Sequence, residues 1–136
     1  MYLKDYIPNI NKNIGKTFFS GIYSKSSLVK KDGIFFAIEG NNFDGNDFIK
    51  DAIKKGAKII FSEKEIRNKK KNIKYIKSRN VRKLLSEISY KIFNKKFIKL
   101  VAVTGTNGKS SVADFYYQIL NLNLKKVASI GTIGVK

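Results

Sequence analysis

The sequence predicts an α/β fold in two parts, a small domain over residues 1–95 and the opening β-α-β unit of a second α/β domain over residues 96–136. Three observations predict this class. Short, β-branched apolar runs alternate with segments whose apolar residues recur at helical spacing. Turns rich in Gly and Asn separate these segments. Near the C-terminal end, a glycine-rich turn joins an apolar run directly to a helical pattern, as in a β-α-β unit.

The first domain is expected to follow the order β, β, α, β, β, α. Apolar runs predict strands at residues 16–23, 34–38, 58–61 and 73–76. Residues 1–16 are polar and are expected to be irregular, and the basic stretch 63–72 is expected to be an exposed loop or a ragged helix.

Two helices are predicted in this domain, at residues 47–55 and 80–93. The first should be capped by Asn46 or Asp47 and should stop at Gly56. Its inward face is Ile49, Ala52 and Ile53, and that of the second helix is Val81, Leu84, Leu85, Ile88 and Ile92. Each helix therefore has one apolar stripe with which to cover a sheet.

The glycine-rich turn has the pattern of a phosphate-binding loop. Phe97 and Ile98 lead into an apolar run at residues 100–103, which is predicted to be a buried parallel strand. The loop itself is Gly105, Thr106, Asn107, Gly108, Lys109, Ser110 and Ser111. A helix follows, with Val112, Phe115, Tyr116 and Ile119 on its predicted inward face. The motif is shorter than the general G-x-x-x-x-G-K-[ST] pattern, which would have glycine at Val103.

Each residue type in the loop suits an anion. Glycines let the backbone turn and approach a phosphate closely. The first N–H groups of the helix point at the anion, together with the positive end of the helix dipole. Lys109 adds a full positive charge for the β- and γ-phosphates of a nucleotide, and the Ser110 hydroxyl is a suitable Mg2+ ligand. The second part is therefore predicted to open a P-loop nucleotide-binding domain, whose loop binds phosphate groups and Mg2+.

A further strand is predicted at residues 127–130, before the Gly-rich stretch 131–134. A single β-α-β unit cannot cover both faces of a doubly wound sheet. The nucleotide-binding domain is therefore expected to be incomplete in this chain.

Composition narrows the chemistry further. The 136 residues contain no Cys and no His, which excludes thiolate chemistry and imidazole bases. The net charge is +18, but only three of the 28 basic residues are Arg, so a solvated lysine surface is favoured over a nucleic-acid interface. We see no signal peptide and no membrane-spanning run, and we expect a cytoplasmic monomer that binds neither nucleic acid nor membranes.

Several separated motifs resemble those of the Mur ligases. The stretch T-G-T-N-G-K-S at 104–110 resembles the ATP loop of that family, which shares the shortened spacing. The segment 24–40 resembles the family pattern D-S-R-x-V-x-x-G-D-x-F-x-A-x-x-G, and 42–49 resembles its F-D-G-H-D-F-I continuation. The S-I-G-T-I-G stretch at 129–134 is similar to a segment of the members that add the third residue to UDP-N-acetylmuramoyl-L-alanyl-D-glutamate.

The resemblance implies an ATP-dependent amide ligase of peptidoglycan precursor synthesis, acting through an acyl phosphate. It implies that residues 1–95 bind the UDP-N-acetylmuramoyl peptide and that the loop binds ATP, with Lys109 as the catalytic residue and Ser110 as the metal ligand. The implied contacts to the UDP end are Ser24, Ser26, Asn41, Asn42 and Phe43. The family's later carboxylates, modified lysine and C-terminal domain have no counterpart here. The chain alone is therefore expected to give no product from ATP, the UDP-dipeptide and diaminopimelate or lysine.

The sequence departs from the family pattern at three places. Lys25-Ser26-Ser27 replaces D-S-R, the usual G-D appears as Asp32-Gly33, and Asn46 replaces a His. Three alternatives stay open: the related ligase that adds the terminal dipeptide, a non-catalytic module that binds a nucleotide or UDP-sugar, and a basic nucleic-acid-binding protein.

Overall fold

The computed structural model describes residues 1–8, 10–93 and 99–136. Contacts group the chain into two compact units, Met1–Lys95 and Lys96–Lys136, and each is described by itself. The predicted approach to a strand through Phe97 and Ile98 lies outside the described residues.

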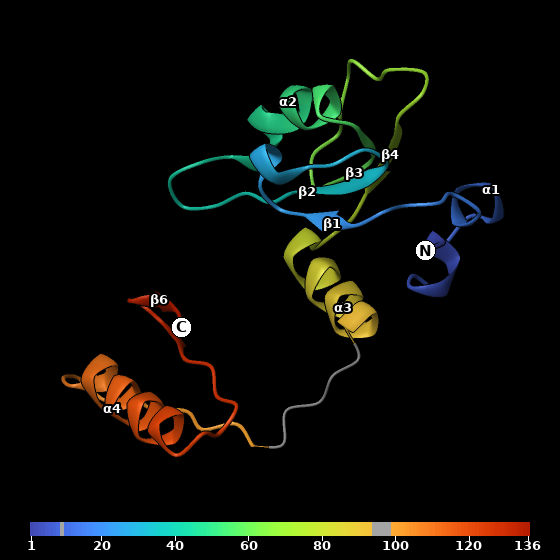
Figure 1. Cartoon of the computed structure of the whole chain (residues 1–136). Helices are drawn as coiled ribbons and strands as arrows, with labels where there is room; N and C mark the ends of the chain where they lie inside the picture. Colours follow the sequence, from blue (N-terminus) through green and yellow to red (C-terminus); the bar gives the residue numbers. More distant parts are fainter. Residues whose placement is uncertain (9, 94–98) are drawn as a thin grey trace. The chain divides into compact units, whose positions relative to one another are not determined.

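The first unit is built on a four-stranded parallel sheet with the strand order β1-β2-β3-β4 (Figure 1). Its strands are β1 (Ile22–Tyr23), β2 (Gly33–Ala37), β3 (Ala57–Ser62) and β4 (Lys74–Lys77). Every neighbouring pair is parallel, with Phe36 opposite Phe61 and Phe61 opposite Ile76. The predicted order β, β, α, β, β, α is confirmed, as is the α/β class.

The sheet is covered on both faces by helices. Figure 1 shows α2 (Ile49–Lys54) on one side of the sheet and α3 (Val81–Phe93) on the other. On α2, Ala52 is fully buried, and Gly56 follows the helix at φ 107°, a left-handed backbone that confirms it as the stop. On α3, Val81 and Ile88 are fully buried. Both helical stripes predicted from spacing therefore face the core.

Two apolar clusters lie on opposite faces of the sheet, because side chains alternate along β2 and β3. Ile34 and Phe36 join the cluster that includes α3, whereas Phe35 and Ala37 join the cluster that includes α2. The Phe36 and Phe61 rings stack at the centre of the first cluster, with centroids 5.1 Å apart. The sheet is therefore buried on both faces, as parallel sheets require.

The segment before β1 is more structured than predicted. It contains a 3-10 helix, η1 (Leu3–Asp5), and a short helix, α1 (Lys12–Gly15). Leu3 is fully buried and packs in the same cluster as Phe19. The expectation of an irregular polar segment was wrong, because its few apolar residues, Leu3 among them, reach the sheet. The expected strand 16–23 shortens to β1, and Phe18 forms only an isolated bridge to Tyr2.

The second unit contains α4 (Lys109–Leu122) and a hairpin of β5 (Ile130–Gly131) and β6 (Gly134–Val135). Two predictions fail here. Residues 100–103 do not form a strand, and only Ile130 of the predicted strand 127–130 belongs to one. A parallel strand needs a hydrogen-bonded neighbour. Among the described residues of this unit, the only paired strands are the two of the antiparallel hairpin.

The predicted inward face of the third helix is also wrong. Val112, Phe115 and Ile119 are more than half exposed. The less exposed side of α4 is Ala113, Asp114, Tyr117 and Leu120. The hairpin lies against this less exposed side near the start of α4, where Lys136 forms an ion pair with Asp114. Apolar spacing located the helix but did not identify the side that is covered.

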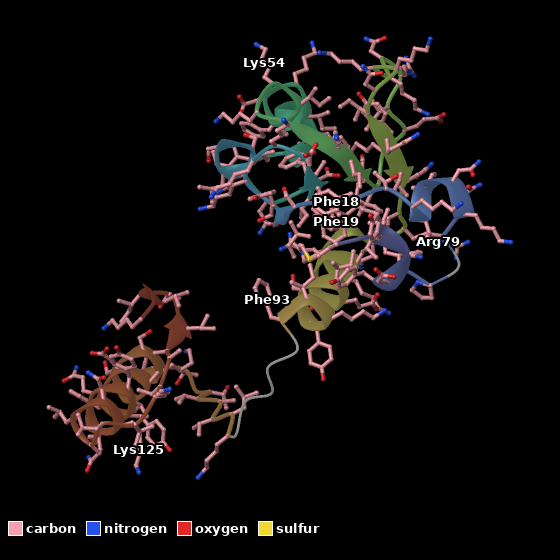
Figure 2. The ribbon with its side chains drawn as sticks, turned by 45° about the vertical axis from the view of Figure 1, so that its right-hand side comes forward. Phe18, Phe19, Lys54, Arg79, Phe93 and Lys125 are labelled. Carbon is pink, nitrogen blue, oxygen red and sulfur yellow. The ribbon has the colours of Figure 1, made fainter. Side chains whose placement is uncertain are left out.

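The lysines form a solvated surface, as the composition indicated. Every lysine that the structure describes is exposed. Figure 2 shows Lys54 and Lys125 as examples. No helix among the described residues is long and apolar enough to span a membrane.

Candidate functional site

The loop at residues 105–111 has the backbone of an anion cradle. Gly105 and Gly108 adopt φ angles of 148° and 75°, which L side chains rarely adopt. Gly108 is the N-cap of α4, and its carbonyl accepts the first helical hydrogen bond from the Val112 N–H at 2.9 Å. Because the N-cap residue has no side chain, it cannot cap the following N–H groups itself. The start of α4 therefore presents backbone donors to an anion.

The Lys109 side chain folds back over this loop. Its Nζ donates to the Thr106 carbonyl at 3.0 Å and also to the Gly105 carbonyl. The side chain is exposed, and the ammonium carries a third donor. The predicted phosphate-binding charge thus lies directly at the glycine-rich turn.

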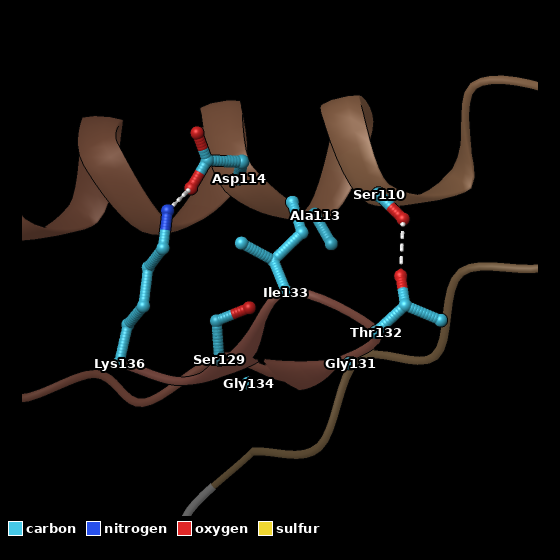
Figure 3. Close-up of a pocket in the computed structure, with 9 residues that line it drawn as sticks. All are labelled: Ser110, Ala113, Asp114, Ser129, Gly131, Thr132, Ile133, Gly134 and Lys136. Carbon is cyan, nitrogen blue, oxygen red and sulfur yellow. Dashed lines mark hydrogen bonds and ion pairs between the residues drawn. The ribbon is translucent and has the colours of Figure 1, made fainter.

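Ser110 lines a small pocket between α4 and the hairpin (Figure 3). Its Oγ lies 3.0 Å from the Thr132 Oγ1, within hydrogen-bonding distance. One turn later, Asp114 forms an ion pair with Lys136 and accepts a hydrogen bond from Gln118 at 2.7 Å. Lys136, followed by Gln118, lowers the pKa of the Asp114 carboxyl.

This donor set fits a magnesium ion that is held mainly by its nucleotide. The described residues contain no cluster of three or more His, Cys, Asp or Glu that could hold a metal. The Asp114 carboxylate is already paired with Lys136, so the Ser110 hydroxyl is the predicted ligand that is available at the loop. Mg2+ commonly takes one or two protein ligands and completes its shell with phosphate oxygens and water.

The predicted substrate residues gather at the carboxyl edge of the parallel sheet. Ser24 and Ser26 follow β1, and residues 41–43 lie in the loop that follows β2. Because β1 and β2 are adjacent and parallel, both segments leave the sheet at the same edge. Ser24 is exposed and Ser26 is partly buried, while Phe43 is 74% exposed. The structure thus brings the two predicted segments to one edge, where ligands of open α/β sheets bind.

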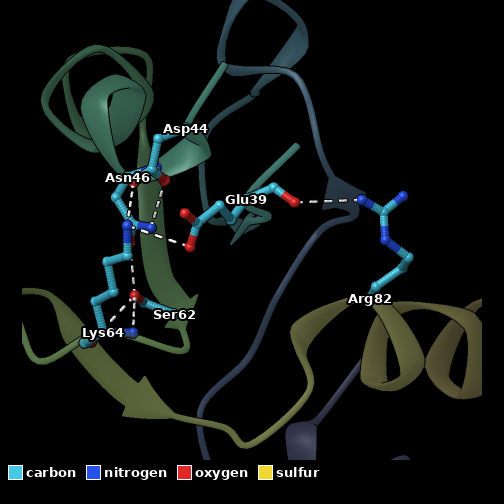
Figure 4. Close-up of polar contacts among 6 residues, drawn as sticks. All are labelled: Glu39, Asp44, Asn46, Ser62, Lys64 and Arg82. Atoms are coloured by element: carbon cyan, nitrogen blue, oxygen red, sulfur yellow. Dashed lines mark hydrogen bonds and ion pairs between the residues drawn. The ribbon is translucent and has the colours of Figure 1, made fainter. Parts of the chain in front are cut away.

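A polar network joins this edge to the end of β3, and the sequence did not reveal it (Figure 4). The Lys64 Nζ pairs with Asp44 Oδ2 at 2.6 Å and with Glu39 Oε2 at 3.2 Å. The buried Ser62 hydroxyl, 1% exposed, donates to Asn46 Oδ1 at 2.6 Å. The only sequence signal was Asp44-Gly45-Asn46, whose side chains favour local turns. The partners at the end of β3 and just after it are 16 to 20 residues away along the chain.

Asn46 explains one departure from the family pattern. Its Oδ1 accepts from Ser62, and its Nδ2 donates to Asp44 Oδ1 at 2.6 Å. A neutral imidazole offers the same pair, one donor and one acceptor. The predicted capping of α2 by Asn46 or Asp47 was wrong, since its N-cap is Phe48, which makes no side-chain cap hydrogen bond. Asp44 instead caps the preceding 3-10 turn by accepting from the Asn46 N–H at 2.8 Å.

The reversed Asp32-Gly33 order also has a structural reason. Asp32 adopts a left-handed φ of 62°, which Asp tolerates better than most residues. A Cβ at Gly33 would lie 2.7 Å from the Tyr23 ring and 2.9 Å from the Lys30 carbonyl. Glycine therefore fits best at the start of β2, and Asp32 occupies the left-handed position that precedes it.

The network predicts a pH dependence of stability. The Lys64 ammonium, followed by the Asn46 N–H, lowers the pKa of Asp44 from 3.8 to about 2. A depressed folded-state pKa gives stability that is present above about pH 4 and lost as the pH falls towards 2. After a discount for solvent screening we expect roughly 1 kcal/mol. Urea unfolding of the native chain and Asp44→Asn should differ by this amount at pH 5 and converge near pH 2.

The control for this measurement is Asp47→Asn, since Asp47 is an exposed neighbour in the same segment. Its difference from the native chain should stay within about 0.5 kcal/mol, as expected for surface changes. An Asp44→Asn difference that does not shrink on acidification would contradict the assigned ion pair.

With this geometry in place, comparison with known proteins identifies the family. The model of "Mur ligase family, catalytic domain" matches residues 19–92, which include the sheet, α2 and all of α3 except its last residue. The chain belongs to the Mur ligase family. The matched residues include both predicted substrate segments and the Lys64 network, so these lie in a part that the family shares.

Curated members of the family are similar over nearly the whole chain. The UDP-N-acetylmuramoyl-L-alanyl-D-glutamate--2,6-diaminopimelate ligase of Rickettsia conorii is 50% identical over 119 residues, which are 85% of this chain and 24% of that protein. The UDP-N-acetylmuramyl-tripeptide synthetase of Borrelia garinii is 39% identical over 118 residues, 84% of this chain and 23% of that protein. The chain thus spans about a quarter of the length of these relatives.

Solved Mur ligases share the fold. The MurF ligase from Thermotoga maritima in complex with ADP aligns with a TM-score of 0.58 and 26% identity, covering 74% of this chain and 23% of that one. A UDP-N-acetylmuramoyl-L-alanyl-D-glutamate--2,6-diaminopimelate ligase aligns over the whole chain and 28% of its own length, with a TM-score of 0.72 and 22% identity. The α/β fold is therefore that of Mur ligases.

Proposed function

We propose that this chain carries the substrate-binding and ATP-binding parts of a ligase that adds the third residue to UDP-N-acetylmuramoyl-L-alanyl-D-glutamate. The observation that supports the proposal is that one chain contains both features. It has a phosphate-type loop at 105–111, and the segments after β1 and β2 meet at the carboxyl edge of its parallel sheet. The names and 39–50% identities of the curated relatives support the choice of reaction.

In this proposal each of the two units binds a different ligand. Residues 1–95 bind the UDP end of the substrate through Ser24, Ser26 and residues 41–43. Residues 96–136 supply the ATP loop. The reaction makes an amide by phosphorylating a substrate carboxylate and letting an amine displace the phosphate, which depends on positioning and charge neutralisation. Such chemistry suits a chain without His or Cys.

Within the loop, the glycines admit the phosphates, the N–H groups at the start of α4 bind their oxygens, and Lys109 neutralises charge on the β- and γ-phosphates. Ser110 is the residue that would hold Mg2+, which supplies further neutralisation of phosphate charge. Thr132, 3.0 Å from Ser110, orients that hydroxyl. We propose that the protein is a cytoplasmic monomer that binds neither nucleic acid nor membranes.

Equilibrium titrations test the proposal. The native chain should bind UDP and, independently, ATP with Mg2+. Ser26→Ala combined with Asn42→Ala should weaken UDP binding at least tenfold and leave ATP binding within twofold. Tight binding of single- or double-stranded DNA with a steep salt dependence, and no binding of UDP or ATP, would instead support the nucleic-acid alternative.

One observation favours a second candidate, the ligase that adds the terminal dipeptide. The ADP-bound MurF ligase of Thermotoga maritima aligns with 74% of the chain at 26% identity. The higher identity to third-residue ligases makes this the less favoured assignment.

A further inference from the structure

The loop after β2 has a fixed base and a free tip. At the base, the Gly45 N–H donates to the Ile38 carbonyl at 2.9 Å, and Glu39 and Asp44 form an isolated β-bridge. Nearer the tip, the Gly40 N–H donates to the Phe43 carbonyl at 2.9 Å. The tip, residues 41–43, is exposed. The loop has two limbs, one that leaves β2 and one that returns from the tip. The conformation of the tip therefore depends mainly on the contacts that hold these two limbs together.

Lys64 joins those two limbs. Glu39 lies on the limb that leaves β2, and Asp44 lies on the limb that returns. One ammonium group reaches both carboxylates, at 3.2 Å and 2.6 Å respectively (Figure 4). An ammonium has three donors and can serve both carboxylates at once. Lys64 follows β3, so the loop is tied to the strand next to the one that it leaves.

Two further contacts make the returning limb a rigid anchor. A Cβ at Gly45 would lie 2.6 Å from both the N and O atoms of Ile38, so the limb is packed directly on the backbone of the other limb. The buried Ser62 hydroxyl donates to Asn46 and accepts from the Lys64 N–H at 3.0 Å. The side chain of Lys64 therefore starts from a fixed backbone position, and its ammonium adds the cross-link between the limbs.

We propose that Lys64 is a positioning residue that holds the tip, residues 41–43, in the conformation that receives the UDP end of the substrate. The inference rests on the proposed function, because it takes the tip as the UDP contact. Lys64 does not touch the ligand in this account. Lys64 restricts the conformations of the loop before the ligand binds, so less conformational entropy is lost when binding orders the loop.

The test compares Lys64→Met with the native chain, using UDP as the probe. Amide hydrogen exchange, followed by NMR, should be at least fivefold faster at Gly40 and Gly45 in the variant. UDP affinity should fall about tenfold, and ADP affinity should stay within twofold. Lys64→Arg should keep UDP affinity within about threefold of native, because a guanidinium can also bridge two carboxylates.

Lys58→Met is the matched control. Lys58 also belongs to the β3 region, is 54% exposed, and pairs with an aspartate, Asp32, at 2.5 Å. It lies at the opposite end of the strand from the loop. The substitution removes the same charge from the same part of the chain, so it reports any general electrostatic effect on an anionic ligand. Exchange at Gly40 and Gly45, and UDP affinity, should both remain within twofold of native.

The outcomes separate this inference from the proposed function. Unchanged exchange at Gly40 and Gly45 in Lys64→Met would overturn the positioning role, whether or not UDP binds. Faster exchange with native UDP affinity would also overturn it. A native chain that fails to bind UDP overturns the proposed function, and with it the ligand assigned to the tip. Equal losses of UDP affinity in Lys64→Met and Lys58→Met would show a general charge effect and overturn the inference.

Discussion

Phe36→Ala should lower the free energy of unfolding of the first unit by about 3–5 kcal/mol, the usual cost of removing a buried aromatic ring. Phe36 is fully buried in the cluster between the sheet and α3, and its ring stacks on Phe61 at 5.1 Å. Small domains have a total stability of about 5–15 kcal/mol, so the variant should be close to unfolding. Urea unfolding followed by circular dichroism measures the change.

Phe43→Ala provides the comparison, because Phe43 is also a phenylalanine but is 74% exposed at the tip of the loop. Its unfolding free energy should stay within about 0.5 kcal/mol of the native value. A loss below about 1 kcal/mol for Phe36→Ala would contradict the assigned core, since even a partly relaxed cavity costs more than that.

Lys109→Ala should weaken ATP binding by roughly 10- to 100-fold, which corresponds to the loss of one charge-assisted hydrogen bond of about 1.5–3 kcal/mol. The Lys109 ammonium lies at the glycine-rich turn, where it donates to the carbonyls of Gly105 and Thr106. Calorimetric titration with ATP and Mg2+ gives the affinity directly. UDP affinity should not change, because UDP is assigned to the first unit.

The control for this substitution is Lys125→Ala, an exposed lysine of the same unit beyond the end of α4. Its ATP affinity should match that of the native chain within twofold. Equal losses in both variants would indicate a diffuse attraction by the basic surface and would contradict a specific phosphate loop.

The sequence predicted well those elements whose pattern is local. The runs at 34–38 and 58–61 are short, apolar and rich in β-branched or aromatic residues, and they become the buried strands β2 and β3. The spacing of Val81 and Ile88 placed one face of α3 in the core. In each case the spacing of apolar residues in the sequence matches the positions that are buried in or against the sheet.

Prediction failed where the result depends on what else packs nearby. Residues 100–103 have the composition of a buried strand, yet no described strand of the second unit pairs with them. Val112 and Ile119 have helical spacing, but the hairpin lies against the other side of α4. Composition shows that a segment is able to form a buried strand or an inward helix face. Hydrogen-bond partners and covering elements determine whether it does so.

The candidate site likewise contains one part that could be predicted from the sequence and one part that could not. The motif at 105–111 is contiguous, so its glycine conformations, its lysine and its helix start could all be predicted. The network around Lys64 could not, because it joins a loop after β2 to the end of β3 through residues with no recognisable spacing. Only the parallel register of β2 and β3 brings them together.

The most direct test of the central claim is an NMR map of ligand contacts on the native chain. Backbone amide shifts would be recorded on addition of UDP and then of ADP. We expect UDP to perturb the carboxyl edge of the sheet, at Ser24, Ser26 and residues 41–43, and ADP to perturb residues 105–111. UDP shifts confined to the opposite edge of the sheet, or ADP shifts that leave Gly105 and Gly108 unchanged, would contradict it.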